Sequence, residues 1–265
     1  MERFLFIGGD ARMGYAAEYL NKGRECVIAS DKAADAAVLP LPLKPDFDLS
    51  LLDGAVKRGG RVFAGGSFPA LEEYCREHGL TLYDYLAREE LQVLNAVPTA
   101  EGALEIMIRE TDITLWGSRT LITGFGRIGE VMARMLSALG SQVTVCARRP
   151  EQLAKAEGMG CAAVTFSHEL DGLLPCFDFV INTVPAVVLD EKRLLLMKKG
   201  CLIVDLASKA GTAAYAHSAM AHTGAKIIHA LSLPGKTAPA TAGKIIGKTI
   251  ENILREEEIN GGNKS

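Results

Sequence analysis

The chain has 265 residues, which is enough for two modest domains, each with a core of its own. Hydrophobic residues make up 48% and charged residues 23%, and the net charge of -3 gives no electrostatic reason to expect a nucleic acid or an anionic membrane as partner. No apolar run approaches the roughly 20 residues of a membrane span, so we expect a cytoplasmic protein without a signal peptide. The six cysteines and five histidines show no metal-ligand spacing, which predicts reduced thiols and no metal site.

The first part of the chain alternates apolar runs with amphipathic segments. The apolar runs predict strands at 3–9, 25–30, 61–64 and 81–85. The amphipathic segments predict helices at 13–22, 49–58 and 69–78. The segment 39–45 holds three prolines and is expected to be extended or a loop. Strands that alternate with helices imply a parallel sheet.

The turn after the first strand is rich in glycine but departs from the Gly-x-Gly-x-x-Gly pattern of dinucleotide sites. Asp10 and Met13 stand where the second and third glycines would be, so we do not expect a dinucleotide here. Arg12 is suited to a substrate carboxylate, which the start of the following helix would also favour. A structural salt bridge is the alternative interpretation of Arg12.

A helix that starts at Thr99, after Pro98, is expected to connect the two domains. Thr99 is a candidate N-cap and also a candidate substrate-binding residue. The predicted organisation is an N-terminal substrate or partner domain at 1–98 completed by a C-terminal helix at 239–258, a connecting helix at 99–117, a dinucleotide-binding domain at 118–236 and a disordered tail at 259–265. The fold class is therefore α/β, with two Rossmann-like parallel-sheet domains joined by long helices.

The most informative stretch is a glycine turn between a predicted strand and an amphipathic helix. Its residues are Gly124, Phe125, Gly126, Arg127, Ile128 and Gly129. Gly124 would permit a tight turn, Gly126 would let the backbone approach a pyrophosphate, and Gly129 would let the helix pack closely on the strand. A glycine-rich turn without a ligand is the alternative.

The end of the next strand indicates which dinucleotide binds. NAD sites usually place an acid there, roughly 20 residues past the glycines, to hold the ribose 2′-hydroxyl. This chain has Arg148 and Arg149 instead, and guanidinium groups pair with phosphate in a planar fork. The sequence therefore favours NADP, with a solvated basic loop as the alternative.

Six strands are predicted in the second half, at 120–123, 142–147, 162–166, 177–182, 201–206 and 226–229. Ligands of such sheets bind outside the carboxyl ends of the strands. Asn182, Thr183 and Val184 are expected on the nicotinamide side of the site, whereas Asp205 and Ser208 would line the reaction site.

Lys236 lies in a Pro-Gly turn just before the last helix, which is expected to cross back to the first domain. A cation there could hold an anionic substrate or act as acid or base, although a solvated loop lysine is the alternative. Asp205, His229 and Lys236 all remain candidates for the general base.

Together these segments resemble the first of the two subunits of dipicolinate synthase over nearly the whole chain. The segments that carry the resemblance are Gly8-Gly9-Asp10-x-Arg12, 95–102, 124–129, 182–185, 205–208 and 233–239. The resemblance implies NADP-linked oxidation of dihydrodipicolinate, or of its hydrated tetrahydro precursor, to dipicolinate. It also implies that the second, flavoprotein-like subunit of dipicolinate synthase is a partner and that the protein acts in the sporulating mother cell, and we expect a homo-oligomer.

The wider architecture is similar to D-2-hydroxyacid dehydrogenases, but their catalytic Arg and His are replaced here by the segments at 205–208 and 235–236, so a 2-hydroxyacid substrate is not expected. For a dicarboxylate, Arg12 and Lys236 are the candidate anchors, which requires that the two domains face each other and close about the long helices. Two alternatives stay open, a shikimate-dehydrogenase-like NADP oxidoreductase and a non-catalytic NADP-sensing scaffold protein.

Overall fold

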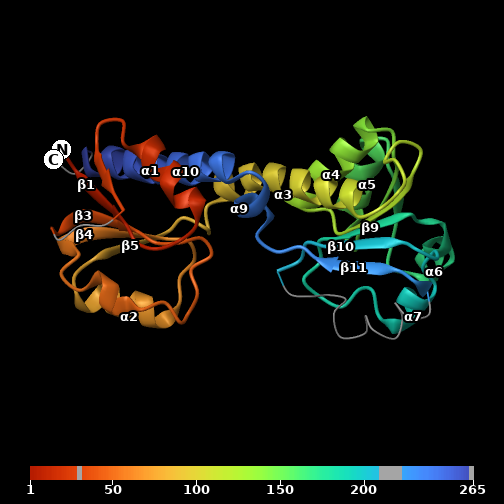
Figure 1. The fold of residues 1–265 in the computed structure, drawn as a ribbon, viewed down its shortest axis with the longest axis horizontal. Helices are drawn as coiled ribbons and strands as arrows, with labels where there is room; N and C mark the ends of the chain where they lie inside the picture. The colour runs from red at the N-terminus through yellow and green to blue at the C-terminus, as the bar shows by residue number, and fades with distance from the viewer. Residues whose placement is uncertain (29–31, 209–222, 263–265) are drawn as a thin grey trace. The chain divides into compact units, whose positions relative to one another are not determined.

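The chain forms two compact units in the computed structural model, which describes residues 1–28, 32–208 and 223–262 (Figure 1). Unit 1 combines Met1–Asn95 with Pro234–Ser265, and unit 2 is Ala96–Leu233. The chain passes between the units twice, once within α3 (Glu89–Arg109) and once within the short helix α9 (Leu233–Thr237). Each strand pairing among the described residues is parallel, which confirms the predicted α/β class with two Rossmann-like sheets.

The sheet of unit 1 has five described strands in the order β2-β1-β3-β4-β5. They are β1 (Arg3–Phe6), β2 (Glu25–Val27), β3 (Ala34–Val38), β4 (Val56–Ala64) and β5 (Thr81–Asp84). This order is one of the two common doubly wound arrangements. Because successive side chains of a strand point to opposite faces, the sheet builds two cores.

Helices cover both faces of this sheet. One face packs against α1 (Ala11–Leu20) and α10 (Pro239–Gly262), and the other packs against α2 (Pro69–Glu77). Figure 1 shows α10 beside α1 on the same face. The prediction that the last helix returns to the first domain is therefore confirmed.

Three elements of unit 1 differ from the prediction. The strand β3 is not predicted from the sequence, because Ala-Asp-Ala-Ala-Val has few of the branched and aromatic residues that mark strands. The helix predicted at 49–58 is only the short 3-10 helix η1 (Leu49–Leu52), and β4 already begins at Val56. Gly60 lets β4 lie close to β3, since a Cβ at Gly60 would lie 2.8 Å from the Asp35 carbonyl oxygen.

The sheet of unit 2 has six described strands in the order β11-β10-β9-β6-β7-β8. They are β6 (Arg119–Thr123), β7 (Gln142–Cys146), β8 (Ala162–Val164), β9 (Phe179–Asn182), β10 (Leu202–Asp205) and β11 (Lys226–His229). All six agree with the strands predicted from the sequence. Numbered within the unit, the order is that of the dinucleotide-binding fold.

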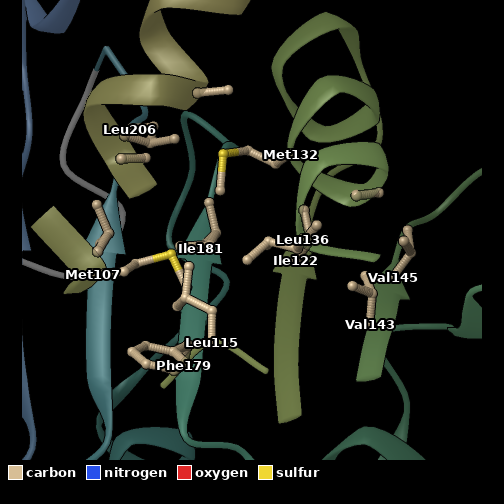
Figure 2. Close-up of a cluster of buried hydrophobic side chains, with 14 of the residues drawn as sticks. Met107, Leu115, Ile122, Met132, Leu136, Val143, Val145, Phe179, Ile181 and Leu206 are labelled. Atoms are coloured by element: carbon tan, nitrogen blue, oxygen red, sulfur yellow. The ribbon is translucent and has the colours of Figure 1, made fainter. Parts of the chain in front are cut away.

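One face of this sheet packs against α3, α4 (Arg127–Ala138) and α5 (Pro150–Gly158). Figure 2 shows this core, in which Met132 and Leu136 of α4 lie over Ile122 of β6. The opposite face packs against α6 (His168–Leu173), the 3-10 helix η2 (Leu174–Cys176) and α7 (Glu191–Leu195). These two cores fix the carboxyl ends of the strands, where the candidate site lies.

The long helices begin and end at other residues than predicted. α3 starts at Glu89, ten positions before Thr99, and Pro98 lies inside it. Proline is common at the first position of a helix, which is why the sequence predicts a start next to Pro98. α10 continues to Gly262, past the predicted end at 258, and residues 263–265 of the predicted tail lie outside the described residues.

Candidate functional site

The glycine turn joins β6 to α4, and two of its glycines are required by the protein itself. Gly124 has φ 87°, and its N–H donates to the Cys146 carbonyl at 2.8 Å. A Cβ at Gly124 would collide with Thr183 Oγ1, and a Cβ at Gly129 would collide with the Gly124 carbonyl oxygen. The predicted tasks of these two glycines, a tight turn and close helix packing, are confirmed.

Gly126 is different, because no protein atom explains why glycine stands there. It is exposed, its φ of -101° suits any residue, and a Cβ would meet nothing within 4 Å. It is the N-cap of α4, yet no side chain caps the helix. The start of a helix attracts anions through its N–H groups and its dipole. The space over Gly126 therefore fits the pyrophosphate of a dinucleotide, with Arg127 and Ile128 beginning the helix below it.

Arg148 and Arg149 follow β7, where an acid would mark an NAD site. Both are exposed, and Arg149 is the N-cap of α5. Its Nε lies 3.3 Å from Glu151 Oε1, but both side chains are about two thirds exposed, so the pair is weak and can be exchanged for a ligand phosphate. The arrangement leaves two exposed guanidinium groups directly after β7.

The carboxyl ends of β6, β9 and β10 are tied together by buried hydrogen bonds. Thr123 Oγ1 donates to Asn182 Oδ1 at 2.6 Å, and Asn182 Nδ2 donates to Asp205 Oδ1 at 2.8 Å. The same Asp205 oxygen accepts from the Ala207 amide at 3.1 Å. Asn182 and Asp205 are each 0% exposed. A satisfied buried network of this kind makes a site rigid.

This burial changes the interpretation of two predicted site residues. From the sequence, Asp205 is expected to line the reaction site and Asn182 to contact the nicotinamide side. The structure places both behind the strand ends, where they hold the segments that follow. Polarity at a strand end suggests contact with a ligand, but the sequence does not show that the two side chains satisfy each other. Thr123, which completes the network, is missing from the predicted site.

The residues that do reach the surface near these strand ends are Thr183, Val184, Ser208 and His229. Thr183 and Val184 are half-buried under the glycine turn, and Ser208 is exposed. His229 is exposed, which decides against a buried strand position. Its Nε2 lies 3.1 Å from the Ala207 carbonyl oxygen. Since a carbonyl only accepts, Nε2 is the donor of this hydrogen bond, and Nδ1 is the ring nitrogen that it leaves unused.

In unit 1, Arg12 is 5% exposed and its guanidinium is in use. Nε and Nη2 donate to the Asp10 carboxylate at 2.9 and 2.7 Å, and Nη2 also donates to the Leu41 carbonyl. The hydrogen bonds from the Arg12 side chain to the Asp10 carboxylate lower the pKa of Asp10. The structure thus has the salt bridge that the sequence left open as the alternative to a substrate contact.

Lys236 lies close to this pair, in the short helix α9 (Leu233–Thr237) rather than in the predicted turn. Its neighbour Gly235 packs on the salt bridge, since a Cβ there would lie 2.8 Å from Arg12 Nε and 2.9 Å from Asp10 Oδ2. Lys236 itself is exposed. Thr99 lies in the interior of α3 and is not an N-cap.

The described part of the chain has neither the side chains of a metal site nor a spanning helix. Among the residues that the structure describes, no group of three or more His, Cys, Asp or Glu side chains could hold a metal ion. None of the described helices combines the length and the apolarity that crossing a bilayer requires.

Comparison with known proteins identifies the family. The model of the D-isomer specific 2-hydroxyacid dehydrogenase NAD binding domain matches residues 99–212. Dipicolinate synthase of Bacillus subtilis has a first subunit, lettered A, that is 33% identical over 201 residues, which are 76% of this chain and 67% of the relative. The chain belongs to the family of this first dipicolinate synthase subunit. The resemblance stated from the sequence is thereby confirmed.

Solved structures agree with this family assignment. The same subunit of dipicolinate synthase from Bacillus halodurans has a TM-score of 0.82 at 27% identity and covers 96% of this chain and 97% of its own. The subunit from Bacillus subtilis has a TM-score of 0.83 at 27% identity, with 98% and 97% covered. Salmonella D-lactate dehydrogenase, at 15% identity and a TM-score of 0.69 with 95% of each chain covered, shows the fold alone. The chain thus carries the nicotinamide-binding domain of a dehydrogenase-like oxidoreductase.

Proposed function

We propose that this chain is the dehydrogenase-like subunit of a dipicolinate synthase and oxidises dihydrodipicolinate, or its hydrated tetrahydro precursor, with NADP as hydride acceptor. The observation that carries the proposal is the match to the first subunit of the Bacillus subtilis synthase over most of both chains. The open position over Gly126 and the arginines after β7 support the cofactor. In line with the family, we place the reaction in the cytoplasm of the sporulating mother cell, with the second, flavoprotein-like subunit as partner and self-association into a homo-oligomer.

The protein's part in this reaction is to bind, orient and accept a proton. The dihydro ring loses one hydride and one proton to become aromatic, and the hydrated precursor loses water as well. A bound nicotinamide cofactor supplies the hydride acceptor. The α4 N-terminus would hold the pyrophosphate, Arg148 and Arg149 the 2′-phosphate, and Thr183 with Val184 the nicotinamide side. Because aromatisation supplies driving force, orientation is the main catalytic requirement.

His229 is the best candidate for the group that takes the proton. Its imidazole is exposed, with Nε2 held by the Ala207 carbonyl and Nδ1 left as the acceptor. Asp205 is buried and already accepts two hydrogen bonds, so we assign it to positioning together with Asn182. Ser208 is exposed nearby and could orient the substrate.

For the substrate carboxylates we propose Lys236 as the direct cationic anchor. Arg12 Nε and Nη2 are already held by Asp10 and Leu41, so we assign Arg12 mainly to the support of Gly235 and thereby of Lys236. Lys236→Ala should lower kcat/KM by roughly 10–100-fold, the effect of one lost charged contact. NADP affinity should be unchanged. Lys244→Ala, an exposed lysine of α10, is the matched control. Full turnover by Lys236→Ala would refute the anchor.

The test of the function is NADPH formation from freshly generated dihydrodipicolinate, with and without the proposed flavoprotein-like partner. We expect turnover that depends on NADP. Tight NADP binding without turnover under either condition would instead support a non-catalytic, NADP-sensing scaffold. Turnover with shikimate-type substrates would support a shikimate-dehydrogenase-like oxidoreductase. Either of these two results would refute the proposed reaction.

A further inference from the structure

We propose that Gln152 is a positioning residue that sets the spacing between the two phosphate sites of the dinucleotide, and so helps to determine cofactor specificity. The inference rests on the proposed NADP site, because it concerns how that site is held together. It follows from one hydrogen bond between Gln152 of α5 and the glycine turn. Neither helix propensity nor helix capping explains why the Gln152 side chain makes this bond.

Gln152 is the third residue of α5, after the N-cap Arg149 and Pro150. A glutamine at this position commonly reaches back to the N–H of its own N-cap residue. Here no side chain caps α5, and Gln152 Nε2 lies 2.8 Å from the Phe125 carbonyl oxygen. Because that oxygen only accepts, the amide NH₂ of Gln152 must be the group that faces it. The side chain therefore stabilises a contact with another element instead of its own helix.

Phe125 offers this hydrogen bond from a rigid point. Phe125 is 2% exposed and belongs to the core of unit 2. The preceding Gly124 is fixed by its N–H bond to Cys146, and Thr183 leaves no room for a Cβ there. The residue that follows is Gly126, over which the pyrophosphate would lie. Gln152 is thus bonded to the backbone that immediately precedes the pyrophosphate position.

The other end of this connection is the 2′-phosphate site. Arg148 and Arg149 immediately precede α5, so any shift of α5 moves them relative to Gly126. A second contact, Lys155 Nζ to Glu130 Oε2 at 2.7 Å, also links α5 to α4, but the lysine is 56% exposed and the pair is screened by water. The hydrogen bond of the half-buried Gln152 is therefore less exposed to water than this ion pair, and it connects the two phosphate sites more firmly.

This arrangement predicts a dependence on the ligand that a general loss of stability would not give. NADP occupies both phosphate sites at once, so it benefits when their spacing is already correct. A ligand with only the 2′-phosphate, such as 2′-AMP, does not sense the spacing. Removal of the tie should weaken NADP binding and leave 2′-AMP binding unchanged.

The experiment compares wild type, Gln152→Ala and Gln142→Ala by calorimetric titration with NADP, NAD and 2′-AMP, with thermal melts of each variant. Gln142 is an exposed glutamine at the start of β7 and serves as the control. We expect the Kd for NADP to rise about threefold to tenfold in Gln152→Ala only, the effect of one lost neutral hydrogen bond. The Kd for 2′-AMP should stay within error.

Several results would overturn the inference. Unchanged NADP binding in Gln152→Ala, or an equal loss for NADP and 2′-AMP, would reduce Gln152 to no role or to a structural one. If the wild type does not bind NADP more tightly than NAD, the proposed cofactor is wrong and the inference fails with it. If the wild type prefers NADP and Gln152→Ala binds NADP with the same Kd as the wild type, the proposed cofactor stands and only the inference about Gln152 fails.

Discussion

At the residue scale, the choice of cofactor depends on the two arginines after β7. Replacing Arg148 and Arg149 by alanine should weaken NADP binding by about 1.5–3 kcal/mol for each charged contact that is lost. NAD binding should change little, because NAD has no 2′-phosphate to meet these side chains. Calorimetric titration with both dinucleotides is the measurement. An equal loss for NADP and NAD would contradict the assignment.

Gly126 allows a second test with a built-in control. Gly126→Val should abolish dinucleotide binding without unfolding the protein, since its Cβ meets no protein atom and its φ is ordinary. Gly129→Val should instead lower the melting temperature, because its Cβ collides with the Gly124 carbonyl. Titration and thermal melts of both variants check this pair. A stable Gly126→Val protein that still binds NADP would exclude this turn as the site.

These residues also show how far the sequence could predict the site. The tasks of Gly124 and Gly129 follow from the spacing pattern, which reflects backbone conformation and packing, and the structure confirms them. Asp205 could not be placed in the same way. Its burial depends on hydrogen bonds from Asn182 and Ala207, and such partners are known only once the strands are paired.

At the element scale, the start of α1 depends on Asp10. Its carboxylate accepts the Arg12 N–H at 3.0 Å as N-cap and also pairs with the Arg12 guanidinium, which lowers its pKa below the ordinary 3.8. Asp10→Ala should reduce the free energy of unfolding by about 1–2 kcal/mol at neutral pH. Asp10→Asn should reduce it less, because asparagine keeps the cap but loses the charge. Chemical denaturation of the three proteins is the measurement.

The pH dependence of this contribution has a definite sign. A carboxyl whose pKa is lowered by folding stabilises the protein above its unfolded pKa of 3.8, and this stabilisation is lost as the pH falls through the lower folded value. The difference between wild type and Asp10→Asn should therefore be constant near neutral pH and close in acid. Because Asp10 is half exposed, solvent screening limits its size. If the difference in the free energy of unfolding between wild type and Asp10→Asn grew in acid, the role of the carboxylate charge would be refuted.

Elements with strong local signals can be predicted from the sequence, and those set by tertiary contacts cannot. Five strands of unit 2 have several branched or aromatic residues, β8 is followed by Thr165 and Phe166, and all six lie at nearly the predicted positions. The strand β3 is mostly alanine, and its identity comes from pairing on both sides with β1 and β4. In α3 the packing of its apolar residues outweighs the start signal of Pro98. In both cases neighbours in space decide what local propensity cannot.

At the scale of the whole molecule, the two units differ in how the chain builds them. Unit 2 is a continuous segment, and every residue proposed for the dinucleotide lies within it. Unit 1 needs two segments that are far apart in the sequence. The alternation of strands and helices predicted both sheets, and the apolar stripe of the last helix predicted its return to the first domain. The apolar stripe of the last helix does not by itself show that α10 packs against α1 and the sheet of unit 1.

This difference predicts opposite outcomes for two truncations. The fragment 89–233 keeps α3 and all of unit 2, so it should fold and bind NADP with close to full affinity. A chain that ends at Thr237 loses α10 and with it the buried side chains of Ile246, Ile250 and Leu254, which cover α1 and the sheet of unit 1. Burial of one such side chain is worth about 1.5–3 kcal/mol, so losing three removes much of the roughly 5–15 kcal/mol that stabilises a domain.

Circular dichroism, proteolysis and calorimetric titration of both truncated proteins measure these outcomes. In the chain that ends at Thr237, unit 1 should be digested rapidly while a fragment close to unit 2 survives and binds NADP. A synthetic α10 peptide added in trans should restore protection, because the missing contacts are confined to one helix face. If unit 1 resists proteolysis without α10, or if the fragment 89–233 fails to bind NADP, the division of labour between a continuous cofactor unit and a two-segment unit 1 is wrong.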